Sequence, residues 1–317
     1  MPRSKPNSAP GPPRPAHPAT VSGRWLLAAI AIAVPGAALC AWAVLCLLFW
    51  QGSWQLLYHP TSGIARTPAS AGLAFDPVAF ATTDTGATQL QGWWISATSP
   101  ARYTVLYMHG ADGNLGDTLS DLALLHGAGV NLLAFDYRGY GQSRFVHPSE
   151  SNWRQDSEWA LQYLVATRHI DPRTIVLDGS SLGANLALEF AAAHPELAGV
   201  VLESPLDAPV SAIFDDPRAR LVPAHILVSD RYDIRAPAAA LRIPSLWFYP
   251  SLQPSILGFP EKPGAFQMVK SPKNLIGLTA NRDRKVDISR ALTRWLSDLP
   301  NHGSNLPLCE LDDGFVC

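Results

Sequence analysis

The segment Ile175-Val176-Leu177-Asp178-Gly179-Ser180-Ser181-Leu182-Gly183 places a G-x-S-x-G sequence between an apolar run and an amphipathic helical pattern. Flanking glycines let a chain turn sharply between a strand and a helix, so that the central serine side chain is exposed at the turn. This context predicts a turn that presents Ser181 as a nucleophile. The alternative interpretation is that Ser181 only caps the helix that follows.

A second glycine-bearing turn, His109-Gly110-Ala111-Asp112-Gly113-Asn114, directly follows the apolar run 105–107. Such a turn can aim a backbone N–H at a developing oxyanion, and we predict that Ala111 and Leu182 supply two N–H donors of this kind. The alternative is a plain turn. A phosphate-binding loop is not indicated, because no Lys-Ser or Lys-Thr follows the glycines. We expect His109 to be a structural residue of the turn.

The rest of the chain beyond residue 55 alternates short β-rich runs with amphipathic segments. Strands are predicted at 78–82, 90–95, 104–108, 131–135, 174–177, 200–203, 245–249 and 275–278, and helices at 119–125, 159–166, 186–193 and 288–296. This alternation predicts an α/β fold with a mostly parallel central sheet and helices on both faces. Residues 205–244 contain several prolines and no clean strand, so we predict a cap-like insertion over the carboxyl edge of the sheet.

Residues 25–50 contain no charged residue, and a helix of this length exceeds the roughly 20 residues needed to cross a bilayer core. Trp25, Trp50 and Trp54 lie where interfacial aromatic residues are common. A buried soluble helix is one alternative, and a cleaved signal peptide is another. Because the apolar run is longer than the apolar region of a secretion signal, the sequence favours an uncleaved transmembrane anchor over residues 24–54.

The charges on either side of the apolar run predict its orientation. Residues 1–23 carry basic but no acidic residues and are rich in Pro, Ser and Ala, which predicts a disordered tail. The first charged residue after the run is Arg66. By the positive-inside rule, we expect the tail in the cytoplasm and the following domain outside it, in the periplasm or an extracytoplasmic space.

The composition predicts one globular domain, at 55–300, followed by a C-terminal tail at 301–317. A net charge of -2 provides no basic surface for nucleic acid, so none is expected as a partner. No pair of cysteines has C-x-x-C spacing and no cluster of metal ligands is evident, so neither a metal nor a cofactor is predicted. Cys309 and Cys317 could pair with each other in an oxidising compartment.

Further motifs make the pattern more specific. They are Tyr58-His59-Pro60, Gly92-Trp93-Trp94, the segment 136–143 with sequence DYRGYGQS, and Leu202-Glu203-Ser204-Pro205. With the two turns above, they resemble the membrane-anchored α/β-hydrolase domain proteins, a branch that includes acyl-thioesterases and esterases. The resemblance covers residues 58 to about 299. It implies an α/β-hydrolase fold and a hydrolase of esters or thioesters with Ser181 as the nucleophile. We expect Asp136 and Arg138 to hold the loop after their strand, because buried charges persist mainly when they are paired.

The sequence departs from this family downstream. The family has the acid of its catalytic triad after the strand at 245–249 and the histidine after the strand at 275–278. Here the two loops begin with Pro-Ser-Leu-Gln and Thr-Ala-Asn-Arg-Asp, and no histidine occurs between His225 and His302. A serine hydroxyl without a positioned base is a poor nucleophile at neutral pH.

Rearranged groups would be needed to complete the site. His302 and His225 are candidate bases, and Asp207 or Glu203 would supply the acid from the strand after the Ser181 turn. If none of them does so, the chain is a pseudoenzyme that keeps the fold and binds a ligand or a partner protein of unknown identity. If the site is active, its position near a bilayer favours a lipid-like or acylated small-molecule substrate.

Overall fold

A computed structural model of the protein describes residues 22–82, 86–250, 264–278 and 284–299, and the chain divides into two compact units after Leu48. Most of helix α1 (Gly23–Gly52) lies in the first unit. Its 30 residues give a length of roughly 45 Å, which exceeds the roughly 30 Å hydrocarbon core of a bilayer. The predicted helix at 25–50 is confirmed. It is long and apolar enough to cross a membrane, and this finding fits both a membrane anchor and a signal sequence.

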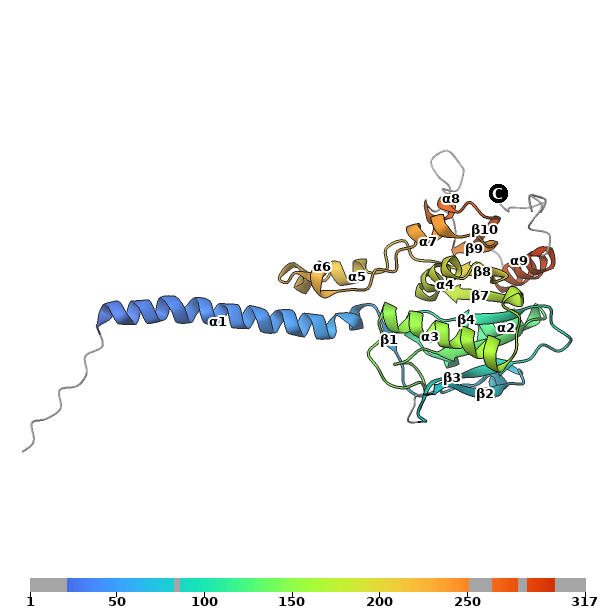
Figure 1. The fold of residues 1–317 in the computed structure, drawn as a ribbon, viewed down its shortest axis with the longest axis horizontal. Helices are drawn as coiled ribbons and strands as arrows, with labels where there is room; N and C mark the ends of the chain where they lie inside the picture. Colours follow the sequence, from blue (N-terminus) through green and yellow to red (C-terminus); the bar gives the residue numbers. More distant parts are fainter. Residues whose placement is uncertain (1–21, 83–85, 251–263, 279–283, 300–317) are drawn as a thin grey trace, which may run out of the picture. The chain divides into compact units, whose positions relative to one another are not determined.

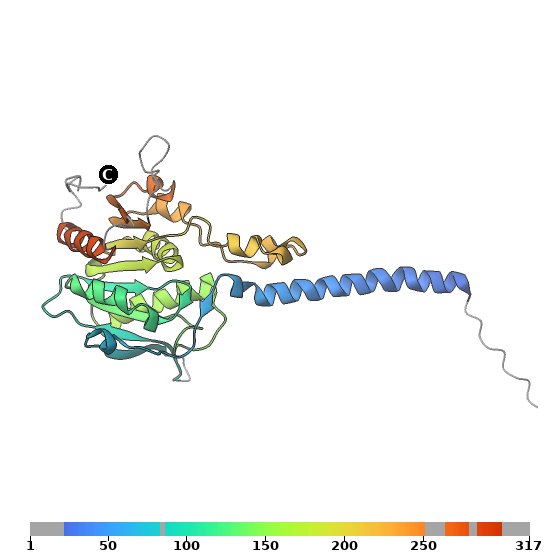
Figure 2. The same cartoon turned by 180° about the vertical axis from the view of Figure 1, so that it is seen from behind.

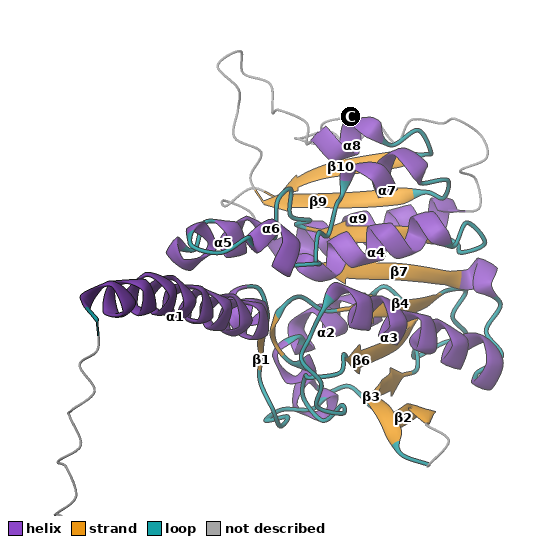
Figure 3. Cartoon of the chain, turned by 60° about the vertical axis from the view of Figure 1, so that its left-hand side comes forward, coloured by secondary structure: helices purple, strands orange, loops and turns teal. Residues whose placement is uncertain are grey.

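The second unit, from Phe49 onward, is built around an eight-stranded sheet with the order β10-β9-β8-β7-β4-β6-β3-β2 (Figure 3). The strands are β2 (Asp76–Thr82), β3 (Thr88–Ile95), β4 (Thr104–Met108), β6 (Asn131–Asp136), β7 (Ile175–Ser180), β8 (Gly199–Glu203), β9 (Ser245–Pro250) and β10 (Lys273–Leu278). β3 runs antiparallel to β2 and β6, and every other neighbouring pair is parallel. The predicted mostly parallel sheet is therefore confirmed. A separate short sheet pairs β1 (His59–Pro60) with β5 (Asp112–Gly113).

Helices cover both faces of this sheet. α3 (Glu150–Gln162) and α4 (Leu182–Ala193) lie on the face turned forward in Figure 1. On the opposite face, seen in Figure 2, α2 (Leu119–Gly127) and α9 (Arg284–Asp298) pack against apolar side chains of the strands. Smaller elements complete the unit: the short helices α7 (Arg235–Ala240) and α8 (Gly264–Met268), the π-helical turn η4 (Tyr163–Thr167), and the 3-10 turns η1 (Ser53–Leu56), η2 (Pro68–Ala71), η3 (Leu115–Asp117) and η5 (Pro172–Thr174).

The helix predicted at 159–166 begins much earlier than expected, at Glu150. The Ser149 side chain accepts a hydrogen bond from Asn152 N–H and so caps the first turn. The first residues of α3 are mostly polar, so an apolar periodicity does not reveal them. Its last turn widens into η4. The helix therefore starts where its cap lies rather than where its apolar face becomes continuous.

The predicted insertion at 205–244 consists of two parts. Residues 206–232, called the insertion below, carry α5 (Ser211–Phe214), the 3-10 turn η6 (Pro217–Arg220) and α6 (Ala224–Leu227). α7 follows and packs against α4. Both ends of the insertion meet at the buried Asn185 of α4, whose Nδ2 donates to Leu206 O and Tyr232 O, at 2.7 and 3.1 Å. Leu206 N–H donates to Asn185 Oδ1 at 2.8 Å. One side chain therefore closes the base of a 27-residue loop (232 − 206 + 1).

Candidate active site

The turn between β7 and α4 holds Ser181 in a strained backbone conformation. Its φ of 54° and ψ of -121° lie in a region that residues other than glycine rarely adopt. The Ser181 side chain makes no capping hydrogen bond to α4, so the interpretation of Ser181 as a helix cap is wrong. Ser181 N–H instead donates to Glu203 O, at the end of β8, at 2.8 Å. Such strain persists only where the surrounding structure enforces it, and it is common at functional sites.

Close packing enforces this turn. A Cβ at Gly183 would collide with the carbonyl oxygens of Met108 and His109. A Cβ at Gly110 would lie only 3.4 Å from Ser181 Cβ. The first turn of α4 and the turn after β4 are therefore in backbone contact, with the Ser181 side chain beside Gly110. Space requires the glycine at position 183, and the close approach of Gly110 to Ser181 brings the two predicted oxyanion turns together.

Ala111 lies in the second of these turns, with its carbonyl oxygen fixed from two sides. Tyr140 Oη and His59 N–H both donate to Ala111 O, at 2.8 and 2.9 Å. The Ala111 N–H has no hydrogen-bond acceptor among the described residues. Leu182 begins α4, where backbone N–H groups lack partners within the helix. The assignment of Ala111 and Leu182 as oxyanion donors stays a prediction, and this arrangement is compatible with it.

The His109 side chain is held in a buried structural position. Its Nδ1 donates to Gly110 O at 2.8 Å, and its ring packs against Tyr137, Tyr140 and Trp153. Burial lowers its pKa to about 4, so the imidazole is neutral at pH 7. The expectation of a structural histidine in this turn is confirmed.

The loop after β6 is held by the two charged residues expected to do so. Asp136 accepts hydrogen bonds from the backbone N–H groups of Gln142, in this loop, and of Leu115, and burial raises its pKa to about 7. Arg138 Nε lies 2.6 Å from Asp156 Oδ1, and burial raises the pKa of Asp156 to about 6 in spite of this pairing. Both groups therefore stabilise the loop, and the expectation for Asp136 and Arg138 is confirmed.

The candidate bases are not joined to Ser181. His225 lies on α6, is exposed, and stacks on Phe214 with ring centroids 4.2 Å apart. His302 lies outside the described residues. Across the described part of the chain, no hydrogen bond connects Ser181 Oγ to a histidine or a carboxylate. The proton acceptor that a serine nucleophile needs is therefore not evident from the described geometry.

The candidate acids lie at the same sheet edge in different settings. Asp207 is exposed, and its carboxylate together with burial raises the pKa of Tyr249 at the end of β9. The Tyr249 hydroxyl is therefore protonated at neutral pH, and it has no hydrogen-bond partner among the described residues. Glu203 contributes its backbone oxygen to Ser181 N–H, whereas its carboxylate lies near the buried Asp178. The structure thus brings the backbone of Glu203 to Ser181, whereas the Glu203 carboxylate lies near Asp178, inside strand β7.

Two residues of this region, Asp178 and Asn185, are not predicted from the sequence. Asp178 is fully buried in β7, and neither carboxylate oxygen has a hydrogen-bond partner among the described residues. Burial and the nearby Glu203 carboxylate raise the pKa of Asp178 well above its ordinary value, which favours its protonated form. A lone Asp inside an otherwise apolar strand was the available signal. Asn185, which closes the insertion, gave no signal because its partners lie 21 and 47 residues away.

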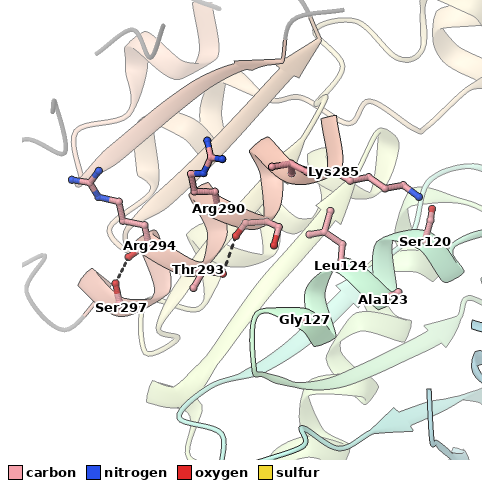
Figure 4. Close-up of a pocket in the computed structure, with 11 residues that line it drawn as sticks. Ser120, Ala123, Leu124, Gly127, Lys285, Arg290, Thr293, Arg294 and Ser297 are labelled. Carbon is pink, nitrogen blue, oxygen red and sulfur yellow. Dashed lines mark hydrogen bonds between the residues drawn. The ribbon is translucent and has the colours of Figure 1, made fainter. Parts of the chain in front are cut away.

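The structure also contains a surface groove of about 860 Å³ between α2 and α9 (Figure 4). Its walls carry the cationic side chains of Lys285, Arg290 and Arg294 with small and apolar residues of α2. No residue of the Ser181 turn lines this groove, so it is separate from the candidate active site. Within the described ranges, no three His, Cys, Asp or Glu side chains converge to hold a metal ion.

Comparison with known proteins agrees with this geometry. Residues 99–248, which include the Ser181 turn, match the family model described as serine aminopeptidase, S33. The fold matches the solved Pyrococcus furiosus esterase with a TM-score of 0.54 and 17% identity, over 77% of this chain and 97% of that chain. The chain contains an α/β-hydrolase domain. An α/β hydrolase from a Penicillium species has the same fold, with a TM-score of 0.54, 20% identity and coverage of 73% and 99% of the two chains.

Curated relatives match this α/β-hydrolase domain protein over shorter stretches. An uncharacterized protein of Mycobacterium tuberculosis is 34% identical over 162 residues, which cover 50% of this chain and 56% of that protein. Alpha/beta hydrolase domain-containing protein 17C of Mus musculus is 35% identical over 119 residues, or 37% of each chain. The match thus spans only about half the length of the mycobacterial relative. These partial matches agree with the α/β-hydrolase fold.

Proposed function

We propose that this protein is a membrane-anchored serine hydrolase that cleaves esters or thioesters, with Ser181 as the nucleophile. The observation that carries the proposal is the strained Ser181 backbone, with φ of 54° and no capping role for the side chain. A serine held in this way beside Gly110 serves a nucleophile better than it serves helix α4. The match to a hydrolase family over the same residues supports it.

The proposed reaction follows from the placement of the two turns. Ser181 Oγ attacks the carbonyl carbon of the substrate and passes its proton to a base, which gives a tetrahedral intermediate. The N–H groups of Ala111 and Leu182 donate to the negatively charged oxygen of this intermediate. The alcohol or thiol then leaves with the proton, and water hydrolyses the remaining acyl-serine. His302 or His225 is the proposed base, with Asp207 as the accompanying acid.

The proposed substrate class follows from location. An enzyme anchored by α1 would meet lipids and acylated molecules at a higher local concentration than dissolved esters. A Pyrococcus furiosus protein of the same fold is described as an esterase, and the matched family model is named for aminopeptidases. The proposed chemistry is the common step of these reactions, acyl transfer through a serine.

A second function has one specific observation in its favour. The sequence contains no histidine between His225 and His302. This interval includes the two loops where the family carries the acid and the histidine of its triad. A pseudohydrolase that keeps the turn and binds an acyl group or a partner protein would not need a base. The two functions differ in whether Ser181 forms a covalent adduct.

Labelling with an activated fluorophosphonate separates them. If Ser181 is a nucleophile without a conventional base, wild-type protein should label more slowly than a full-triad hydrolase of this fold, by roughly 10³-fold or more, and Ser181→Ala should not label. Folded wild-type protein that labels no more than Ser181→Ala would refute the serine hydrolase and support the pseudohydrolase. Strong labelling retained in His225→Ala and His302→Ala would identify a base elsewhere and exclude the pseudohydrolase.

The proposed topology places residues 1–23 in the cytoplasm and the hydrolase domain outside it. The support is the excess of basic residues before α1, because Arg66 is the first charged residue after it. A reporter fused after Cys317 should be active outside the cytoplasm, and a cysteine replacing Ser8 should be protected from external thiol reagents. Cytoplasmic activity of the C-terminal reporter would reverse this orientation.

A further inference from the structure

Three large apolar side chains stand out on the surface of the hydrolase domain. Beyond α1, the most exposed of the described large hydrophobic residues are Ile226, Phe145 and Leu221, with exposed fractions of 84%, 73% and 61%. The remaining three, Val286, Met268 and Val165, are all less than half exposed. Ile226 and Leu221 belong to the insertion, and Phe145 belongs to the loop after β6. Exposed apolar side chains of this size indicate an interaction site where the segments that carry them meet.

These two segments converge on η1. The Trp54 ring of η1 stacks on His147, with centroids 4.9 Å apart, and His147 contacts the Phe145 ring at 5.8 Å. Helix α5 of the insertion also packs against η1. The three exposed apolar side chains therefore belong to segments that both contact the same four-residue turn, although they are 76 and 81 residues apart in sequence (221 − 145 and 226 − 145).

The chain places η1 next to a membrane if α1 is anchored in one. η1 begins at Ser53, directly after the last residue of α1, Gly52. At about 2 Å per residue of a 3-10 turn, residues 53–56 extend no more than about 8 Å beyond the end of the helix. Trp54 is also the residue type that favours the membrane–water interface. Chain continuity therefore keeps η1, and with it the start of the hydrolase unit, within reach of the headgroups of a membrane that holds α1.

The insertion is held firmly enough to present its apolar residues. Tyr58 Oη donates to Asp230 Oδ2 at 2.6 Å, and the Glu150 carboxylate accepts Arg231 N–H at 2.6 Å. Together with the Asn185 contacts, these bonds fix the base of the loop while Ile226 and its neighbours project from it. The base is therefore tied to the domain by several polar contacts, and no large movement of the domain is needed for contact with lipid.

Basic residues stand beside the exposed apolar positions. Arg144 precedes Phe145 and Arg220 precedes Leu221, and both arginines are exposed. An apolar side chain next to an arginine suits the boundary between acyl chains and anionic headgroups. A binding site for a soluble protein would not need these apolar and arginine residues to lie on segments that contact η1, beside the end of α1. The lipid surface is therefore the partner that the position and the charges favour.

We infer that the insertion and the Phe145 loop dip into the outer part of the same membrane that holds α1, through Ile226, Leu221 and Phe145. The inference rests on the membrane anchoring proposed above, and it is independent of catalysis. Both ends of the insertion are hydrogen-bonded to Asn185 of α4, the helix that begins directly after Ser181. Lipid contact by the insertion would therefore bring the Ser181 edge of the sheet next to the bilayer. A lipid-like substrate could then reach Ser181 from the membrane rather than from solution.

Photo-crosslinking of the full-length protein tests the inference directly. The amino acid p-benzoylphenylalanine replaces one residue at a time in protein reconstituted into vesicles of phosphatidylcholine and phosphatidylglycerol that contain an alkyne-tagged phospholipid. Probes at Ile226 and Leu221 report the insertion, a probe at Leu39 reports α1, and a probe at Val286 on α9 is the matched control on an exposed apolar position. After irradiation, the attached lipid is detected by a fluorescent azide.

The expected result is strong lipid attachment at Ile226, Leu221 and Leu39, and several-fold weaker attachment at Val286. Attachment at Leu39 with Ile226 and Leu221 no higher than Val286 would overturn the inference while leaving the membrane anchor intact. No attachment at any position, Leu39 included, would overturn the anchor and the inference with it. Two probes in the insertion guard against one substitution disturbing the loop, and none of these readouts depends on hydrolysis.

Discussion

Replacing Ser181 with glycine should stabilise the domain while abolishing its labelling by fluorophosphonates. The backbone at this position has φ of 54° and ψ of -121°, a conformation that costs a residue with a side chain about 1–3 kcal/mol. Glycine adopts it freely but loses about 0.5–1 kcal/mol of additional chain entropy on folding. The net change for Ser181→Gly is therefore a gain of roughly 0–2.5 kcal/mol in the free energy of unfolding.

Two control substitutions separate strain from chemistry. Ser181→Ala keeps the strained backbone and loses no capping hydrogen bond, so its free energy of unfolding should stay within about 0.5 kcal/mol of wild type. Ser204 has a similar φ of 53° at the end of the neighbouring strand, so Ser204→Gly should also stabilise. It should not remove the fluorophosphonate label, because its side chain takes no part in the proposed reaction.

Thermal unfolding of the full-length protein in detergent micelles, followed by tryptophan fluorescence, measures these changes. For a domain of this size, a gain of 1 kcal/mol should raise the midpoint by roughly 2–4 °C. If Ser181 were instead a helix cap, Ser181→Ala would cost about 1 kcal/mol and Ser181→Gly a few tenths. A glycine variant less stable than wild type would therefore refute the strain argument and weaken the nucleophile assignment.

Three further predictions follow from other groups. Burial and a nearby carboxylate raise the pKa of Asp178, so Asp178 in the folded protein keeps its proton at pH values where the unfolded chain, above about pH 4, has lost it. Asp178→Asn should therefore raise the free energy of unfolding by an amount that grows by up to about 1.4 kcal/mol per pH unit above that value. A difference in the free energy of unfolding that does not change with pH would contradict this. Asn185→Ala removes three hydrogen bonds, about 3 kcal/mol, and trypsin should then cut within the insertion first; unchanged cleavage would count against the clamp. Cys309 and Cys317, outside the described residues, should be joined in unreduced peptides analysed by mass spectrometry, with up to about 2–3 kcal/mol of stabilisation, and two free thiols would argue against an oxidising location.

Most of the sheet could be predicted because each strand carries its own signal. The buried runs at 105–108 and 132–135 are continuous apolar segments bounded by polar residues, and both lie in strands at the predicted positions. The Ser181 turn was equally readable, because the glycines that its geometry requires are visible at fixed spacing. Local sequence thus specifies those parts of the fold whose physical requirements are local.

The parts that were not predicted depend on distant contacts. Asn185 closes a loop whose two ends are 26 residues apart (232 − 206), and no local pattern marks an amide for that task. The convergence of Trp54, His147 and α5 likewise joins segments from three regions of the chain. The sequence therefore predicts residues 205–244 as one insertion, whereas the structure divides them into a loop clamped at its base, residues 206–232, and helix α7, which packs against α4.

The Ser181 turn combines two features that both oppose stability. Ser181 is held at a strained φ, and three residues before it the fully buried Asp178 has no hydrogen-bond partner among the described residues. Natural sequences break such local rules mainly at functional sites, where the arrangement is needed for binding or chemistry. A fold that had lost every use for Ser181 could relax this turn with a single glycine. The persistence of the strained serine therefore favours a site that still uses Ser181, and it makes the source of its base the central question of the mechanism.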